Sequence, residues 1–307
     1  MTASPETSQR DRIPAVLSIA GSDSGGGAGI QADLKAFARC GVHGMTAITA
    51  ITCQNTVAVE GVTPVPPEAI VGQVKAVLDD IGVDAVKIGM LGSVETIEAV
   101  REAIALLPGG TPIVLDPVMM AESGAHLLEP GARQALVNLL PVATVVTPNL
   151  AEAKALIETA SLEVAAAHAD QATLARAVHA LGPTHVVVTG GHGGGDVVVD
   201  LFFDREDEVP IEGPRQPGAA EHGSGCTHSS ALAAHIALGL SPLEAARAAH
   251  EIAAEAVRDG LVGIGRGPGP VNALGMLVGG RQGAWHNPRH AVSAPDAGQG
   301  RGDPRRG

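Results

Sequence analysis

Short apolar runs alternate with amphipathic stretches along most of the chain. The run from Ala15 to Ala20 predicts a buried strand. Ile30, Leu34 and Phe37 then mark one face of a helix that ends near Gly41. The further predicted strands cover residues 45–51, 84–90, 112–115, 144–147 and 185–189, and the further predicted helices cover 66–81, 94–107, 131–140, 173–181 and 241–259.

The rhythm changes in the last third of the chain, where residues 197–203 and 208–211 predict the two strands of a hairpin. Before it, regular alternation of strands and helices is typical of a parallel sheet covered by helices on both faces. The sequence therefore predicts an α/β fold with a mostly parallel central sheet and a small hairpin near residues 196–212. We expect a single domain over residues 13–278, between a disordered leader (1–12) and a disordered tail (279–307).

The composition limits the classes of function. A net charge of -13 and 1% aromatic residues argue against a nucleic-acid surface, which needs clustered cations or stacking platforms. No apolar run resembles a signal peptide or a membrane span, so we expect neither secretion nor membrane insertion. Cys40, Cys53 and Cys226 lie too far apart for a disulfide framework or a metal motif. We therefore expect a cytoplasmic protein that holds any anionic ligand locally.

A glycine-rich turn leads into a strong helix pattern at His222-Gly-Ser-Gly-Cys226. Gly223 and Gly225 leave the first amides of that helix uncovered, and these amides and the helix dipole attract anions. The same field is expected to lower the pKa of Cys226. The alternative is that the glycines only start a helix and that Cys226 fills space beneath it.

A second glycine-rich stretch runs from Gly21 to Gly29 and follows the first predicted strand directly. It lacks the Gly-Lys-Ser/Thr of a phosphate loop and the G-x-G-x-x-G of a dinucleotide site. We interpret it as a wall of a small-molecule site, and a flexible turn at the sheet edge is the alternative. Other predicted strands also end at candidate site residues, where ligands bind in such sheets: Gln54, Met90, Asp116 and Asn149.

Six motifs, taken together and in order, resemble those of one enzyme family. They are Ala20-Gly-Ser-Asp-Ser-Gly-Gly-Gly-Ala-Gly-Ile-Gln-Ala-Asp-Leu-Lys35, Ile51-Thr-Cys-Gln-Asn-Thr56, Lys87-Ile-Gly-Met-Leu91, Leu115-Asp-Pro-Val-Met119, Thr147-Pro-Asn-Leu-Ala-Glu152 and His222-Gly-Ser-Gly-Cys-Thr227. This set, which spans about residues 13–274, resembles the hydroxymethylpyrimidine/phosphomethylpyrimidine kinases of thiamine biosynthesis, in the ribokinase-like superfamily. The resemblance implies ATP-dependent phosphorylation of 4-amino-5-hydroxymethyl-2-methylpyrimidine on its hydroxymethyl group, and then of the monophosphate to the diphosphate.

The resemblance also implies roles for individual residues. Cys226 falls at the catalytic base, and the anion hole matches Gly223, Ser224 and Gly225. The positions around the pyrimidine match Gly21, Asp33, Gln54 and Met90. A primary alcohol needs a base to accept its proton, and a transferred phosphoryl group needs donors aimed at its charge, so these residue types suit the chemistry.

ATP and Mg²⁺ are the implied cofactors, and the homologues suggest a homodimer. Asn149 and Glu152 form an Asn-x-x-Glu pattern, which a capped helix start also produces. The resemblance adds nucleotide binding to Asn149 and a share in holding Mg²⁺ to Glu152. Asp116, at a strand end, is expected to orient metal-bound water, or alternatively to cap the following turn.

One position departs from the family pattern, because Thr189 stands where the family commonly has lysine before Gly-Gly-His. The missing charge bears on how a phosphate group is clamped, and so on the second phosphorylation. Pyridoxal kinase and a non-catalytic pyrimidine-binding protein therefore stay open as alternatives. A nucleotide-dependent oxidoreductase lacks its fingerprint. His222 and His228 have no metal-ligand spacing, so structural or surface roles are expected for them.

Overall fold

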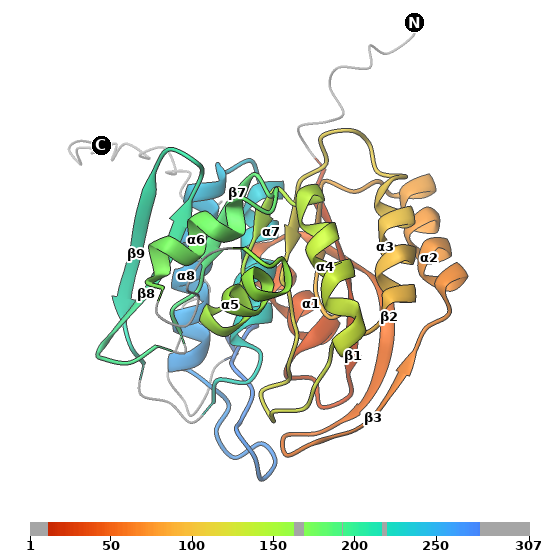
Figure 1. Ribbon diagram of the computed structural model, residues 1–307. Coiled ribbons are helices and arrows are strands. Elements are labelled where there is room, and N and C mark those ends of the chain that lie inside the picture. The colour runs from red at the N-terminus through yellow and green to blue at the C-terminus, as the bar shows by residue number, and fades with distance from the viewer. Residues whose placement is uncertain (1–11, 163–168, 192, 217–219, 277–307) are drawn as a thin grey trace, which may run out of the picture. The chain divides into compact units, whose positions relative to one another are not determined.

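A nine-stranded sheet forms the centre of the part of the chain that the computed structural model describes, which is residues 12–162, 169–191, 193–216 and 220–276 (Figure 1). The strand order is β3-β2-β1-β4-β5-β6-β7-β8-β9. The strands are β1 (Ala15–Asp23), β2 (His43–Gln54), β3 (Val59–Pro64), β4 (Ala85–Ile88), β5 (Ile113–Leu115), β6 (Val145–Val146), β7 (His185–Val188), β8 (Val197–Phe203) and β9 (Glu208–Pro214).

Six neighbouring strands pair in parallel, in the order β2, β1, β4, β5, β6 and β7, which confirms the predicted sheet. The two edges are antiparallel: β3 pairs with β2, and β8 pairs with both β7 and β9. The predicted hairpin is confirmed as β8 and β9. Because the carboxyl ends of the parallel strands meet at one edge of the sheet, the loops that follow β1, β4, β5, β6 and β7 gather there.

Helices cover both faces of the sheet, as predicted (Figure 1). They are α1 (Gly29–Cys40), α2 (Pro67–Asp80), α3 (Val94–Ile104), α4 (Arg133–Leu139), α5 (Leu150–Thr159), α6 (Gln171–His179), α7 (Ser224–Ala237) and α8 (Pro242–Arg258). Along β1, Leu17 and Ile19 pack into the core under α2 to α6, whereas Val16 packs under α1, α7 and α8. Burial of both faces explains why β1 is a continuous apolar run rather than an alternating one.

Among the elements that differ from the sequence expectation are β1 and β3. β1 continues past Ala20 to Asp23, so the loop predicted from Gly21 is shorter and covers residues 24–28. We call residues 24–28 the first glycine loop. β3 was not predicted, because its residues are exposed or only half-buried and show no apolar periodicity. It is held by antiparallel pairing with β2.

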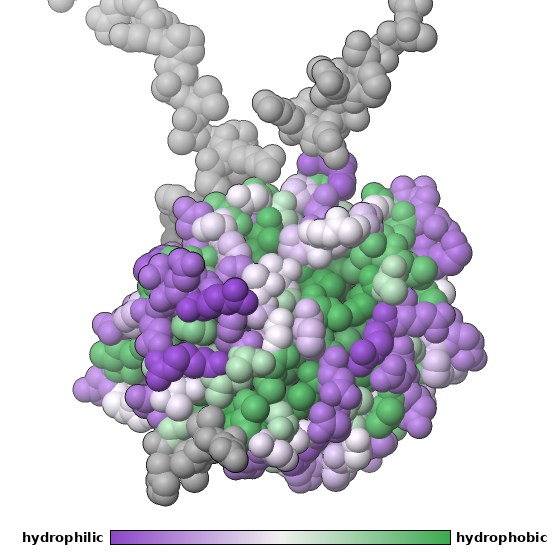
Figure 2. All heavy atoms as spheres, turned by 45° about the horizontal axis from the view of Figure 1, so that its top comes forward, coloured by the Kyte–Doolittle hydropathy of each residue, from purple (hydrophilic) through white to green (hydrophobic). Residues whose placement is uncertain are grey.

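The outer surface carries many hydrophilic side chains, with apolar areas between them, on the face drawn in Figure 2. Among the described residues no helix is both long and apolar enough to cross a bilayer. The described chain up to Met276 forms one compact unit. The predicted leader, except for Arg12, and the predicted tail lie outside the described residues.

Candidate active site

A cavity of about 610 Å³ opens at the carboxyl ends of the parallel strands. Every site residue predicted from the sequence lines this cavity except Asp33: the lining includes Gly21, Gln54, Met90, Asp116, Asn149, Glu152, Thr189, Gly223, Ser224, Gly225 and Cys226. We call the part around Gly21, Gln54 and Met90 the Gln54 end. The part around Thr189 and Val198 is the Thr189 end.

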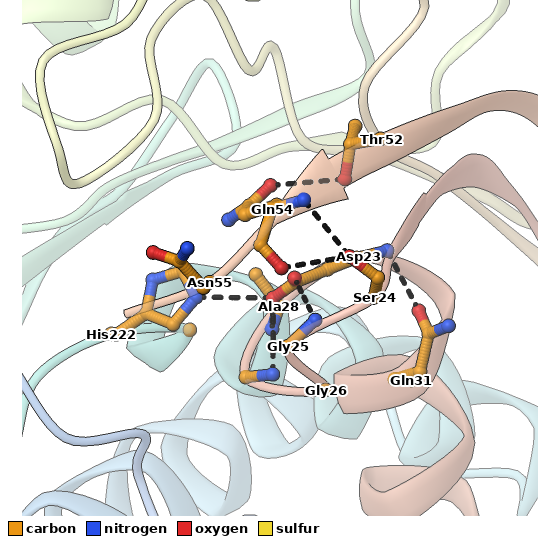
Figure 3. A network of polar contacts seen from close by, with 12 residues as sticks. Asp23, Ser24, Gly25, Gly26, Ala28, Gln31, Thr52, Gln54, Asn55 and His222 are labelled. Carbon is orange, nitrogen blue, oxygen red and sulfur yellow. Dashed lines mark hydrogen bonds and ion pairs between the residues drawn. The ribbon is translucent and has the colours of Figure 1, made fainter. Parts of the chain in front are cut away.

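Asp23 holds the first glycine loop at the Gln54 end (Figure 3). Its Oδ1 accepts the Gly25 amide at 2.8 Å, and its Oδ2 accepts the Gly27 and Ala28 amides at 3.0 and 2.9 Å. His222 Nε2 lies 3.1 Å from the same Oδ2. Burial alone would raise the pKa of Asp23, but the contact with His222 and the loop amides hold that pKa below its usual value. The loop is therefore folded around a buried carboxylate.

The Gln54 end is closely built. A Cβ on Gly21 would lie 2.9 Å from Met90 Sδ, so a larger residue there would displace the Met90 side chain. The backbone of Gln54 is fixed by Ser24, whose hydroxyl donates to the Gln54 carbonyl at 2.7 Å and accepts its amide at 2.9 Å. The Thr52 hydroxyl donates to the Ser22 carbonyl at 2.9 Å, and its oxygen lies 3.2 Å from Gln54 Oε1 (Figure 3). These contacts hold an amide side chain at the cavity wall.

The start of α7 lies against the first glycine loop. Gly223 adopts a left-handed conformation with φ 88°, and no side chain caps the helix. A Cβ on Gly223 would lie 1.8 Å from the Gly27 carbonyl oxygen, so a larger residue would push the two segments apart. The first amides of α7 thus begin at a fixed place beside the loop, as an anion site at a helix N-terminus requires.

Asp33 lies beneath the cavity, and the predicted contact with the substrate does not fit this placement. The residue is fully buried, and its Oδ1 accepts Lys87 Nζ at 2.8 Å and Ser230 Oγ at 2.7 Å. Ser18 Oγ donates to its other oxygen at 2.5 Å. Since Ser230 is one turn along α7 from Cys226, Asp33 anchors the helix that carries the thiol.

Lys87 is a site residue that sequence reasoning did not single out, and it lines the cavity although its side chain is fully buried. Burial would lower the pKa of Lys87, but the Asp33 carboxylate, Cys226 and Asp116 raise it above its usual value. The lysine is therefore charged at neutral pH. A lysine within the otherwise apolar strand β4 was the available signal.

Asp116 and Cys226 lie close enough to the buried Lys87 ammonium to interact with its charge. Asp116 Oδ2 accepts Ser229 Oγ at 2.9 Å, and burial raises the pKa of Asp116 despite the nearby Lys87. Burial also raises the pKa of Cys226 to about 12, although Lys87 opposes the shift. The expectation of a lowered pKa for Cys226 is therefore wrong. Loss of water around the sulfur outweighs both the helix N-terminus and the lysine.

Asn149 and Glu152 form the capped helix start that their spacing allows. Asn149 Oδ1 accepts the amides of Ala151 and Glu152, both at 2.9 Å, and Glu152 Oε2 accepts the Asn149 amide at 3.0 Å. Both residues also line the cavity. Capping and ligand binding therefore remain compatible. The Thr189 amide donates to the Pro148 carbonyl at 2.9 Å, which sets Thr189 next to Asn149.

A second buried carboxylate, Asp200 of β8, serves the loop between β7 and β8. Its Oδ1 accepts the Gly190 amide at 2.8 Å, and His250 Nδ1 lies 2.7 Å from its Oδ2. His228 Nε2 is 3.6 Å from that oxygen. His222, His228 and His250 are buried, so a surface role for the first two is wrong. The only sequence signal for Asp200 was one acid inside an apolar strand.

No group of three or more His, Cys, Asp and Glu side chains in the described ranges is arranged to hold a metal ion. The carboxylates of Asp116 and Glu152 nevertheless line the same cavity. Such a pair suits a Mg²⁺ ion that completes its shell with phosphate oxygens and water.

The family model described as phosphomethylpyrimidine kinase matches residues 23–272. The hydroxymethylpyrimidine/phosphomethylpyrimidine kinase of Rhizobium meliloti (strain 1021) is 48% identical over 259 residues, which cover 83% of this chain and 95% of that protein. The enzyme of the same name from Streptomyces coelicolor is 45% identical and covers 84% of this chain and 94% of its own.

Solved structures of kinases share the fold. The pyridoxal kinase from Staphylococcus aureus in complex with ADP is 36% identical, with a TM-score of 0.76 over 86% of this chain and 94% of that one. The phosphomethylpyrimidine kinase from Clostridium difficile 630 is 37% identical, with a TM-score of 0.65 over 78% of this chain and 96% of that one. On the family model and these relatives, the chain belongs to the phosphomethylpyrimidine kinase family of ribokinase-like phosphotransferases.

Proposed function

We propose that this chain transfers the γ-phosphoryl group of ATP to the hydroxymethyl group of 4-amino-5-hydroxymethyl-2-methylpyrimidine, and then a second group to the monophosphate. The observation that carries the proposal is the continuity of the cavity. Its lining includes the close-fitting Gln54 end, the first turn of α7 with Cys226, and the Thr189 end. One cavity can therefore hold an acceptor and a nucleotide around the same helix N-terminus.

The Gln54 end suits the pyrimidine. The Gln54 amide offers both a donor and an acceptor, which an aminopyrimidine can pair with through its amino group and ring nitrogens. Met90 and Gly21 supply the apolar wall that a flat ring requires. The acceptor's hydroxymethyl group then lies toward α7, where Cys226 can receive its proton.

The Thr189 end suits the nucleotide. Apolar residues of β8 and α8 line it, which fits a purine base: Val198, Ala253, Ala254 and Val257. Asn149 and Thr189 lie together at the adjoining strand ends, where they can bind phosphate oxygens or ribose. Mg²⁺ would be held by Asp116 and Glu152, and when bound it neutralises charge on the phosphates.

Cys226 acts as the base in its thiolate form, so the thiol first releases its own proton to solvent water. With its pKa raised to about 12, the thiol holds its proton at neutral pH in the unliganded protein. The nearby Lys87 ammonium favours the thiolate. The Ser224 amide donates to the Glu221 carbonyl at 3.0 Å, so the next amides of α7, at Gly225 and Cys226, are the ones that can stabilise the charge on the transferred phosphoryl group. Loss of one such donor typically lowers the rate by about a hundredfold or more. Positioning and charge stabilisation thus accompany proton transfer.

The test measures ADP release with the pyrimidine, its monophosphate and pyridoxal as separate acceptors. We expect turnover with both pyrimidines, and Cys226→Ala should remove most of it while leaving pyrimidine affinity nearly intact. Cys40→Ala is the matched control, since that thiol also has a pKa raised to about 12 but lies outside the cavity. Absence of turnover with either pyrimidine would reject the proposal, and unchanged turnover in Cys226→Ala would reject the base.

Pyridoxal remains a second candidate acceptor because of a specific likeness. A structure of the Staphylococcus aureus pyridoxal kinase with AMP-PCP and pyridoxal matches this chain with a TM-score of 0.73 at 34% identity. Pyridoxal also carries a hydroxymethyl group on an aromatic ring. A kcat/KM for pyridoxal above that for the pyrimidine would select this reading.

A further inference from the structure

Arg215 lines the cavity, but its contacts with the described part of the fold engage only two of its three guanidinium nitrogens. It follows β9 directly and lines the cavity at the Thr189 end. Its Nε donates to the Gly195 carbonyl at 2.7 Å, and its Nη1 donates to the Gly191 carbonyl at 2.6 Å. Its side chain thus bridges both ends of the loop after Thr189.

The third guanidinium nitrogen of Arg215 has no such partner. Nη2 is shielded from solvent and makes no hydrogen bond to the described residues. A buried charged donor without an acceptor is costly, and such a group in a native site calls for a ligand or an ion to complete it. A guanidinium nitrogen also suits phosphate, because its charge-assisted hydrogen bonds to anionic oxygens are strong.

The other cationic side chains of the cavity are not placed to bind a phosphate group beside the loop after Thr189. Among the described residues, the Lys and Arg side chains that line it are Lys87, Arg133 and Arg215. Lys87 is engaged with Asp33 beneath Cys226. Arg133 begins α4, which packs on the opposite face of the sheet from α7 and α8. Of these three side chains, only Arg215 contacts the described residues of the loop that begins at Thr189, the position where a charge is lacking.

We propose that Arg215 binds the polyphosphate of the nucleotide and supplies the positive charge that Thr189 does not. The loop carbonyls of Gly191 and Gly195 orient the guanidinium, and Nη2 is left for a phosphate oxygen. This inference rests on the proposed function only in taking the Thr189 end as the nucleotide site. The phosphate would then be bound by the side chain of Arg215, which follows β9, rather than by the residue at position 189.

The test measures binding of ATP, ADP and AMP by calorimetry without any acceptor. Arg215→Gln should weaken ATP binding by about tenfold or more, ADP by less and AMP by under about twofold, since hydrogen bonds to charged groups are the strong ones. Arg215→Lys should fall in between. Adding Thr189→Lys to Arg215→Gln should restore a large part of the ATP affinity, because it returns a cation to the same loop.

Arg176→Gln is the matched control, since Arg176 of α6 pairs with Glu208 at the start of β9 and lies outside the cavity lining. It should leave ATP affinity unchanged. Equal weakening of ATP and AMP by Arg215→Gln would reduce Arg215 to a loop brace and overturn the inference, as would unchanged ATP binding or a larger loss in Arg133→Gln. Because no acceptor is present, a chain that binds ATP in this way but phosphorylates no pyrimidine would refute the proposed function alone.

Discussion

Two glycine loops border the cavity, and each is held by one buried carboxylate that also contacts a histidine. The first glycine loop is folded around Asp23, which accepts three of its amides and lies 3.1 Å from His222. Among the described residues of the loop after Thr189, the Gly190 amide donates to Asp200, which lies 2.7 Å from His250. Arg215 holds the second loop by its carbonyl groups instead.

This difference separates the roles of two loops that look alike in sequence. Three amides of the first loop are already satisfied by a carboxylate of the protein, so a phosphate would compete with Asp23 and meet its negative charge. The second loop is bound from its carbonyl side by a cation, which attracts an anion to that place. A glycine-rich stretch therefore does not identify a phosphate site by itself. Whether a loop can bind phosphate depends on whether its amides or its carbonyl groups are already hydrogen-bonded to the protein.

The largest expected effect comes from crowding the first loop. In Gly27→Ala the new Cβ would lie 2.2 Å from His222 Cδ2, so His222 must move away from Asp23 and displace the start of α7. We expect the free energy of unfolding to fall by about 1–3 kcal/mol and turnover to fall at least about tenfold, because the anion-hole amides lose their alignment. Denaturant unfolding and steady-state kinetics measure the two effects.

The second loop offers a matched control for that change. Gly194→Ala places a Cβ where no atom lies within 4 Å, and Gly194 does not line the cavity. Its free energy of unfolding should stay within about 0.5 kcal/mol of the parent. Equal losses in the two variants would mean that the loops tolerate side chains alike and that the docking of Gly27 on His222 is unimportant.

Removing the charge of Asp23 is expected to lower stability by a similar amount to Gly27→Ala, but without the roughly tenfold loss of turnover that comes from crowding the start of α7. Because the pKa of Asp23 is lowered in the folded protein, its contribution is present above the unfolded pKa and is lost as the pH falls through the folded pKa. Asp23→Asn should lower the free energy of unfolding by about 1–3 kcal/mol at pH 7, since an amide group cannot accept from the loop as the carboxylate does. Urea unfolding measures this difference, which should shrink below about pH 4. A difference that stays constant down to pH 3 contradicts the role of the charge.

Much of the site's outline was predictable from the sequence, for a physical reason. Parallel strands bring their carboxyl ends to one edge, so residues that follow apolar runs, such as Gln54, Asp116 and Asn149, had to lie near one another. The helix start at Cys226 was equally local, because glycines followed by a helix pattern mark it. These predictions needed only the order of the elements.

The rest depended on contacts between distant segments. Asp23 and His222 are 199 positions apart, and Lys87 and Asp33 are 54 apart, so no local pattern pairs them. The pKa of Cys226 failed as a prediction for the same reason, because burial of the sulfur depends on how several segments pack around it. The roles of Asp33 and of the buried histidines follow from packing that a linear pattern does not contain.

The smallest expected effect belongs to Asp200→Asn in the second loop. Asparagine keeps the shape of the side chain, and its carbonyl oxygen can still accept the Gly190 amide while its NH₂ group donates to His250 Nδ1 in the other tautomer. Asp23 has no such substitute, since its Oδ2 alone accepts two amides. We therefore expect nucleotide affinity to fall by only about two- to fivefold, with pyrimidine affinity unchanged, as measured by calorimetry. If pyrimidine affinity falls more than nucleotide affinity, Asp200 supports the Gln54 end, and the proposed difference between the two loops is wrong.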